Sequence, residues 1–299
     1  MVREMVDLGF EYIELSHGVR ITLVPGILRA IEEGIVKVSS THNFCPLPTG
    51  VNQAAPNLFE PSDPDPREIG LWLRHTKRSI DFAVQVNSTA LVCHLGSVQF
   101  LWRNPGRTLA NYIKRHPKAD IPHGRRYQGL LEKAQARLRK RMEPYWERTK
   151  ESVGKVLKYA AERGVRLGLE NREKLEELPV DEDLVDYFGM LPLESAAGYW
   201  HDTGHAHIKE SMGLINHRAQ LENMAARTIG FHLHDVGPDG QDHQSLGSGK
   251  VDFNMISEFW RPEHFLVIEL SPRVPVEGVR ASLARLQKLV KQSGSRPPM

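Results

Sequence analysis

Short apolar runs alternate with longer amphipathic segments along most of the chain. The runs are rich in β-branched and aromatic residues, and they are centred on Tyr12, Val38, Leu91, Leu167, Tyr199, Phe231 and Val267. Between them, apolar residues recur at spacings of three and four, which predicts helices. Strands separated by helices indicate βαβ units and a parallel sheet. The pattern therefore predicts an α/β protein.

This alternation favours a (β/α)8 barrel, the TIM-barrel fold. A chain of 299 residues is long enough for one such barrel with an insertion, so we expect a single domain over residues 1–299. The pattern supplies seven strands, and the chain opens on an apparent helix, VREMVDLG, of the kind that follows a first strand. We therefore expect the first barrel strand to be missing or to lie upstream of the assigned start. Such a barrel would carry unpaired strand edges.

Residues 102–150 interrupt the alternation after the strand that leads to His94. This segment holds 14 Lys or Arg against four acidic residues. We predict a basic helical insertion within the barrel domain, placed over the mouth of the site as a lid or a phosphate-binding surface. The alternative is a solvated helical hairpin whose charges bind nothing specific.

Composition excludes several other classes of protein. The formal net charge is only +2, which gives no general argument for binding nucleic acid or a membrane surface. Two cysteines, Cys45 and Cys93, are too few for a disulfide-dense scaffold or a Cys-rich structural zinc site. No apolar run has the length of a signal peptide or a membrane span. We therefore expect a soluble, cytoplasmic protein with no membrane partner.

Four residues of metal-binding type stand where apolar runs end: Glu170, Asp202, His232 and Glu269. Active-site groups of parallel barrels lie at the carboxyl ends of the strands. Each residue alone would more often be a salt-bridge partner or an interior histidine, but the four together indicate one site. Three carboxylates and one imidazole suit a divalent cation such as Mn, Mg or Co, with Zn also possible.

Further imidazoles are expected near the same rim. His205 follows Asp202 by three positions across a turn that Gly204 would loosen. His234 shares a strand face with His232, which fits either a supporting group or a core residue. We expect the remaining candidates to bind substrate or an additional metal: His42, His94, His205 and His243.

Five segments resemble the xylose isomerase-like barrel superfamily, namely LGLENR, HDTGH, FHLHDV, DHQSLGSGKVDF and FLVIELSP. The resemblance extends over most of the chain outside the basic insertion. This superfamily joins sugar isomerases and epimerases to endonuclease IV-type DNA-repair enzymes. Carried over residue by residue, the resemblance implies that one shared metal is bound by Glu170, Asp202, His232 and Glu269.

The two branches imply different chemistry. The isomerase branch implies proton transfer next to a sugar carbonyl, with Glu170 and Glu269 as base and acid. The endonuclease branch implies further metals, one at His42 and His94 and another at His205 with an Asp-x-His pair in a loop. That pair reads Gln241-Asp242-His243 here, and an amide is a poor zinc ligand, which counts against the endonuclease branch unless Asp239 or Asp242 takes its place by a local shift.

We therefore expect a metal-dependent isomerase or epimerase whose partner is a small carbohydrate or its phosphate. The alternative is an endonuclease IV-type phosphodiesterase that acts on apurinic DNA. A non-catalytic sugar-binding barrel is less favoured, and dehydratases of the superfamily have similar sites. Assembly into a homo-oligomer, in which a second subunit covers the open edge, is left undecided by the sequence.

Overall fold

The computed structural model describes residues 2–116 and 124–294. Within them, one sheet contains seven parallel strands whose order follows the chain. Every predicted strand is confirmed: β1 (Tyr12–Leu15), β2 (Lys37–His42), β3 (Ala90–Cys93), β4 (Arg166–Glu170), β5 (Ala197–Asp202), β6 (Thr228–Leu233) and β7 (Phe265–Ile268).

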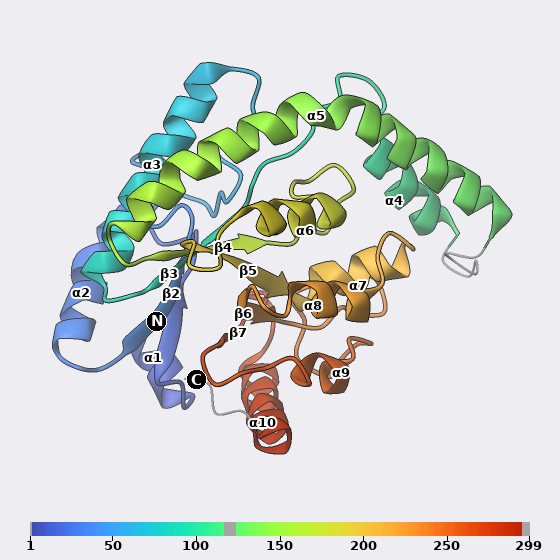
Figure 1. Ribbon diagram of the computed structural model, residues 1–299. Coiled ribbons are helices and arrows are strands. Elements are labelled where there is room, and N and C mark those ends of the chain that lie inside the picture. Colours follow the sequence, from blue (N-terminus) through green and yellow to red (C-terminus); the bar gives the residue numbers. More distant parts are fainter. Residues whose placement is uncertain (1, 117–123, 295–299) are drawn as a thin grey trace.

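The sheet curls into a nearly closed barrel with an open side between β1 and β7 (Figure 1). In the described ranges neither edge strand pairs with the other or with an eighth strand. Both edges border a cavity of about 1400 Å³, whose wall also includes α1 (Val2–Asp7) and α10 (Val276–Ser293). The barrel prediction is thus confirmed in outline, with seven strands in the sheet.

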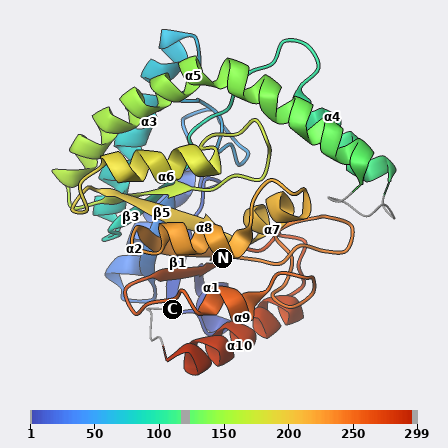
Figure 2. The ribbon, with the colours of Figure 1, turned by 45° about the vertical axis from the view of Figure 1, so that its right-hand side comes forward.

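Helices follow the strands and cover the outside of the sheet (Figures 1 and 2). Local sequence explains where several of them begin. Pro66 is the first residue of α3 (Pro66–Gln85), whose N-cap Asp65 accepts a hydrogen bond from the backbone N–H of Arg67. The remaining barrel helices are α2 (Val24–Glu32), α3 (Pro66–Gln85), α6 (Asp181–Met190), α7 (Thr203–Ser211), α8 (His217–Met224) and α9 (Phe253–Ser257), and the 3-10 helix η1 (Ile21–Leu23) precedes α2.

The described part of residues 102–150 is largely helical. It contains α4 (Pro105–Arg115) and most of α5 (Arg125–Ala161), which continues without a break into the barrel helix before β4. One side of this part of α5 is buried, including Tyr127, Leu131 and Leu138. The insertion is therefore anchored by an apolar face rather than being a hairpin solvated on all sides.

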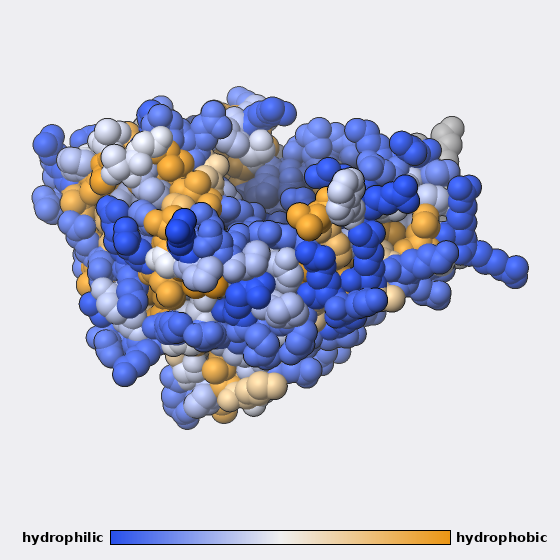
Figure 3. All heavy atoms as spheres, turned by 90° about the horizontal axis from the view of Figure 1, so that it is seen from above, coloured by the Kyte–Doolittle hydropathy of each residue, from blue (hydrophilic) through white to orange (hydrophobic). Residues whose placement is uncertain are grey.

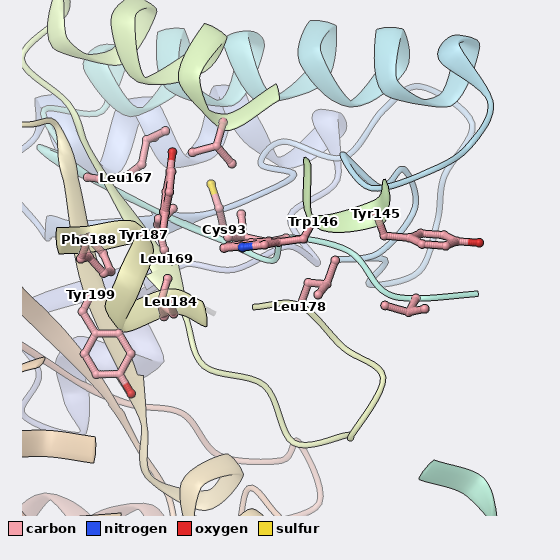
Figure 4. Packing of buried hydrophobic residues seen from close by; sticks show 14 of the residues in the cluster. Cys93, Tyr145, Trp146, Leu167, Leu169, Leu178, Leu184, Tyr187, Phe188 and Tyr199 are labelled. Atoms are coloured by element: carbon pink, nitrogen blue, oxygen red, sulfur yellow. The ribbon is translucent and has the colours of Figure 1, made fainter. Parts of the chain in front are cut away.

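The largest core cluster joins α5 to the outer face of the sheet. Figure 4 shows Trp146 of α5 lying close to Cys93 and Leu169, which come from β3 and β4. Inside the barrel, the fully buried Trp200 packs against Val92 and Ile229. The interior beneath the site is thus filled by side chains, as it is in closed α/β barrels.

The surface seen from above the barrel is mostly hydrophilic, and its hydrophobic areas are smaller (Figure 3). None of the helices in the described residues is long and apolar enough to cross a membrane.

Candidate metal centre

The four strand-end residues meet at one point of the rim. Glu170 ends β4, Asp202 ends β5, His232 lies in β6, and Glu269 directly follows β7. Each offers one ligand atom, and these atoms all lie within 4.8 Å of one another. The structure therefore brings together the four residues that the sequence singles out, which belong to four neighbouring strands.

The contacts within this group suit a cation. His232 Nδ1 lies 2.8 Å from Glu170 Oε1 and 3.1 Å from Glu269 Oε2. Glu170 and Asp202 are fully buried, whereas 23% of the Glu269 side chain is exposed. Three carboxylates so close together out of water need positive charge nearby. The donor set of three carboxylates and one imidazole therefore fits a divalent ion.

Glu14, which the sequence analysis overlooked, orients His232. Its Oε1 lies 3.0 Å from His232 Nε2, and its Oε2 accepts a hydrogen bond of 2.6 Å from Ser40 Oγ. A proton on Nε2 of His232 leaves Nδ1 free to face Glu170 and Glu269, an arrangement common behind metal-binding histidines. The signal was available, because Glu14 also stands near the end of an apolar run.

Asp202 is held by its neighbours on three sides. Its Oδ1 accepts the backbone N–H of His205 at 2.7 Å, and its Oδ2 lies 2.9 Å from His234 Nε2. The side-chain amide of Asn171 forms hydrogen bonds with both the N–H and the carbonyl of Asp202. These contacts fix the carboxylate before any ligand binds.

The loosened turn predicted at Gly204 is wrong. Asp202 is the N-cap of α7, so the helix begins directly at Thr203. A Cβ at Gly204 would lie 2.1 Å from His234 Cε1. Glycine is required here because His234 packs against the first turn of the helix.

The histidines predicted to bind substrate or an additional metal all line the cavity: His42, His94, His205 and His243. His42 and His94 form a group with Glu170 in which the ligand atoms lie within 4.8 Å of one another. Arg172, which the pattern of strand ends did not single out, joins His94 to Glu170: its Nη1 lies 2.8 Å from His94 Nε2 and 2.8 Å from Glu170 Oε2.

The loop after β6 reaches over the centre. His243 stacks on His234 at 4.1 Å between ring centroids, and its Nε2 lies 3.7 Å from Glu269 Oε2. Asp242 forms a further group with Glu173 and His205, also with ligand atoms within 4.8 Å. The aspartate after Gln241, rather than Gln241 itself, therefore approaches His205.

Buried charges shift the titration of these groups. Burial disfavours the charged form of Glu170, but its contacts with His94, Arg172 and His232 outweigh burial and hold the pKa of this carboxyl well below its usual range. Burial likewise opposes ionisation of Glu269, yet His232 and His243 lower its pKa strongly. Burial, followed by the charge of Arg172, lowers the pKa of His94 to about 3. At neutral pH the carboxylates are ionised and His94 is neutral.

The cavity extends from the polar centre into the open side of the barrel. Its polar end includes His17, Glu170 and Glu269, and its apolar end includes Leu266 and Leu283. No described residue of 102–150 lines this cavity, and a role of the insertion as a lid or a phosphate-binding surface stays a prediction. Arg139 of the insertion instead pairs with Glu182 and Asp183 of α6.

Comparisons with known proteins agree with this architecture. One similar solved structure is a D-tagatose 3-epimerase-like protein, with 16% sequence identity and a TM-score of 0.67 over 97% of this chain and 92% of that one. A second is 3-keto-D-glucoside 4-epimerase from E. coli, with 16% identity and a TM-score of 0.65 over 96% of this chain and 92% of that one. A third is D-psicose 3-epimerase from Clostridium cellulolyticum with D-tagatose, with 13% identity and a TM-score of 0.64 over 97% of this chain and 92% of that one. At such identities the likeness shows the fold alone. Curated protein sequences gave no match. A family model described as "Xylose isomerase-like TIM barrel" matches residues 2–289, so the chain belongs to the xylose isomerase-like TIM barrel family.

Proposed function

We propose that the protein is a divalent-metal-dependent isomerase or epimerase that acts on a sugar or sugar phosphate. The observation that carries the proposal is the pair Glu170 and Glu269, which come from nonadjacent strands and whose carboxylate oxygens lie 2.8 Å and 3.1 Å from His232 Nδ1. Both carboxylates belong to the group that fits a divalent ion, and both line the cavity.

The metal would be held by Glu170, Asp202, His232 and Glu269. When bound, it polarises sugar oxygens and stabilises the negative charge that develops as a proton leaves the carbon next to a carbonyl. Glu269 is the more exposed of the two glutamates, so its carboxylate can approach a substrate carbon and accept the proton. Glu170, buried on the other side of the group, would return a proton to the neighbouring carbon or to the opposite face.

Histidines around the cavity would bind hydroxyl groups. Nδ1 of His205 donates to the carbonyl of Asn171 at 3.0 Å, which leaves Nε2 as its second polar atom for a ligand. His17 lines the cavity, and its buried Nδ1 has no hydrogen-bond partner among the residues that the structure describes. The names of the similar structures, among them a D-allulose 3-epimerase in complex with D-allulose, support a carbohydrate as the substrate class.

The endonuclease IV-type activity is the second candidate. It is favoured by the two extra groups of ligand atoms, one around His42 and His94 and one around His205. Against it, Tyr127 and Tyr145 of the basic insertion are buried and cannot stack on exposed bases. The insertion also contributes no described residue to the cavity wall.

The test is to load the protein with Mn²⁺, Co²⁺ or Zn²⁺ and incubate it in D₂O with a panel of ketoses and ketose phosphates. We expect deuterium to enter at the carbon next to the carbonyl and an epimer or isomer to form, both detected by NMR. An abasic DNA duplex is assayed in parallel. Metal-dependent cleavage of the duplex without sugar turnover would support the endonuclease, and sugar binding without exchange would support a non-catalytic barrel.

A further inference from the structure

The group formed by His42, His94 and Glu170 has the composition of a second metal site. The Nδ1–H of His42 donates to the carbonyl of Asn43 at 3.0 Å, and His42 Nε2 lies 3.9 Å from Glu170 Oε2. His94 Nδ1 lies 2.8 Å from Asn57 Oδ1, and its Nε2 lies 2.8 Å from Glu170 Oε2. Both imidazoles therefore direct Nε2 toward Glu170, as they would around a cation.

A guanidinium already occupies this position. Arg172 Nη1 lies 2.8 Å from His94 Nε2 and 2.8 Å from Glu170 Oε2. Because arginine only donates hydrogen bonds and stays protonated, His94 must accept through the lone pair on Nε2. The other ring nitrogen of His94 carries the proton that is donated to Asn57. The lone pair on His94 Nε2, which a metal would need, therefore already accepts a hydrogen bond from Arg172.

Arg172 is fixed in this place by buried partners. It is 7% exposed, and its Nη2 lies 3.7 Å from Oε1 of Glu177, itself 5% exposed. Glu177 is anchored in turn by the backbone N–H of Lys174 at 3.1 Å. Withdrawal of the guanidinium would leave a buried carboxylate without its ion-pair partner, which is strongly unfavourable.

We propose that Arg172 takes the place of a second metal ion and keeps the centre mononuclear. A metal bound to His94 would stand roughly 2.0–2.1 Å from Nε2, in the space that the Arg172 N–H now fills. The guanidinium supplies positive charge to Glu170 from that side, so Glu170 is satisfied without a second ion. Two-metal phosphodiester cleavage needs ions about 3.5–4 Å apart, and the position for the partner ion is taken.

Metal counting tests this assignment. The wild type, His94→Ala, Arg172→Leu and the double variant are stripped with a chelator, reloaded with excess Zn²⁺, desalted and analysed for zinc per chain. We expect the wild type and His94→Ala to hold the same amount. Arg172→Leu should gain one ion per chain, and the double variant should lose it again. Arg172→Lys, which keeps a cation, should match the wild type.

Two results would overturn the assignment. One is a lower zinc content in His94→Ala than in the wild type, since His94 would then bind a metal in spite of Arg172. The other is a folded Arg172→Leu protein, checked by circular dichroism, with the wild-type content. If Arg172→Leu does not fold, the zinc contents of the wild type and His94→Ala alone test the assignment: equal contents support it, and a lower content in His94→Ala overturns it. The inference rests on the metal centre of the proposed function, but the count needs no substrate, so failure of sugar turnover would leave it standing.

Discussion

Glu14 and His232 are joined by a hydrogen bond of 3.0 Å between residues 218 positions apart. Glu14 lies on β1, at one edge of the sheet, and His232 lies on β6, next to the other edge. The contact therefore bridges the open side of the barrel. It also determines which nitrogen of His232 faces the carboxylates of the metal centre.

Substituting Glu14 by Gln should weaken metal binding about 10–100-fold, the usual effect of removing the carboxylate behind a metal-binding histidine. The dissociation constant is measured by competition with a chromogenic chelator. Glu11→Gln is the matched control, because Glu11 belongs to the same region but pairs with the exposed Lys37. Equal affinities for the two variants would contradict the orienting role of Glu14.

Replacing Glu269 by Gln should remove both metal and activity. An amide is a weaker ligand and cannot accept a proton, so we expect turnover to fall about 10²–10⁴-fold. Metal content and turnover are measured on the same preparation, with the exposed Glu263→Gln as control. Normal metal content together with normal turnover would show that the site is assigned wrongly.

Substituting Gly204 by Ala should destabilise the protein by about 1–3 kcal/mol, since the new methyl group would collide with the His234 ring. The displaced His234 would also release Asp202, so the metal affinity should fall as well. Gly129→Ala in α5 is the control, because a Cβ there meets nothing within 4 Å and alanine favours a helix. The free energy of unfolding is obtained from urea titrations, and similar values for both variants would argue against the predicted collision.

His264 should make the protein less stable in mild acid. It is buried, its Nδ1 accepts the backbone N–H of Arg261, and burial lowers its pKa from 6.5 to about 4. A histidine whose pKa is lowered in the folded state binds a proton more readily when the protein is unfolded. Its contribution to the free energy of unfolding is therefore complete above pH 6.5 and is lost as the pH falls toward 4. Between pH 7 and pH 5 the free energy of unfolding should fall by about 2 kcal/mol from this residue.

His264→Gln provides the comparison, because the amide does not titrate in this range. Urea titrations at both pH values should show a smaller loss in the variant than in the wild type. The same loss in both proteins would mean that His264 is already protonated in the native state at pH 5.

Most strands were predictable because they are short apolar runs, and in β3, β4, β5 and β6, which are almost entirely buried, burial on both faces of a parallel sheet leaves a clear trace in composition. The four residues at the metal centre were found for the same reason, since each ends such a run. Glu14 was overlooked although it stands near the end of an apolar run, and Asp242 was considered only as a replacement for Gln241. Arg172 was not identified, because its role depends on which side chains reach it across the cavity. Such contacts arise only once distant strands have come together.

The packing of the insertion was also not predictable from the sequence. Its excess of Lys and Arg correctly marked an unusual segment, but charge alone could not tell which face would be buried. The apolar positions of α5, such as Leu131 and Leu138, pack that face onto the core, while Arg139 pairs with α6. A phosphate-binding role was inferred from composition alone, and it stays a prediction.

The order of the strands also bears on how the chain assembles. Each strand pairs with the next one in sequence, so every ladder can form between neighbours as the polypeptide emerges from the ribosome. The hydrogen bond between Glu14 and His232, by contrast, must wait until nearly the whole chain has been synthesised. The metal centre can therefore form only late in folding. A nascent chain that ends before β6 can already form the first strands of the sheet, but it cannot yet bind the ion.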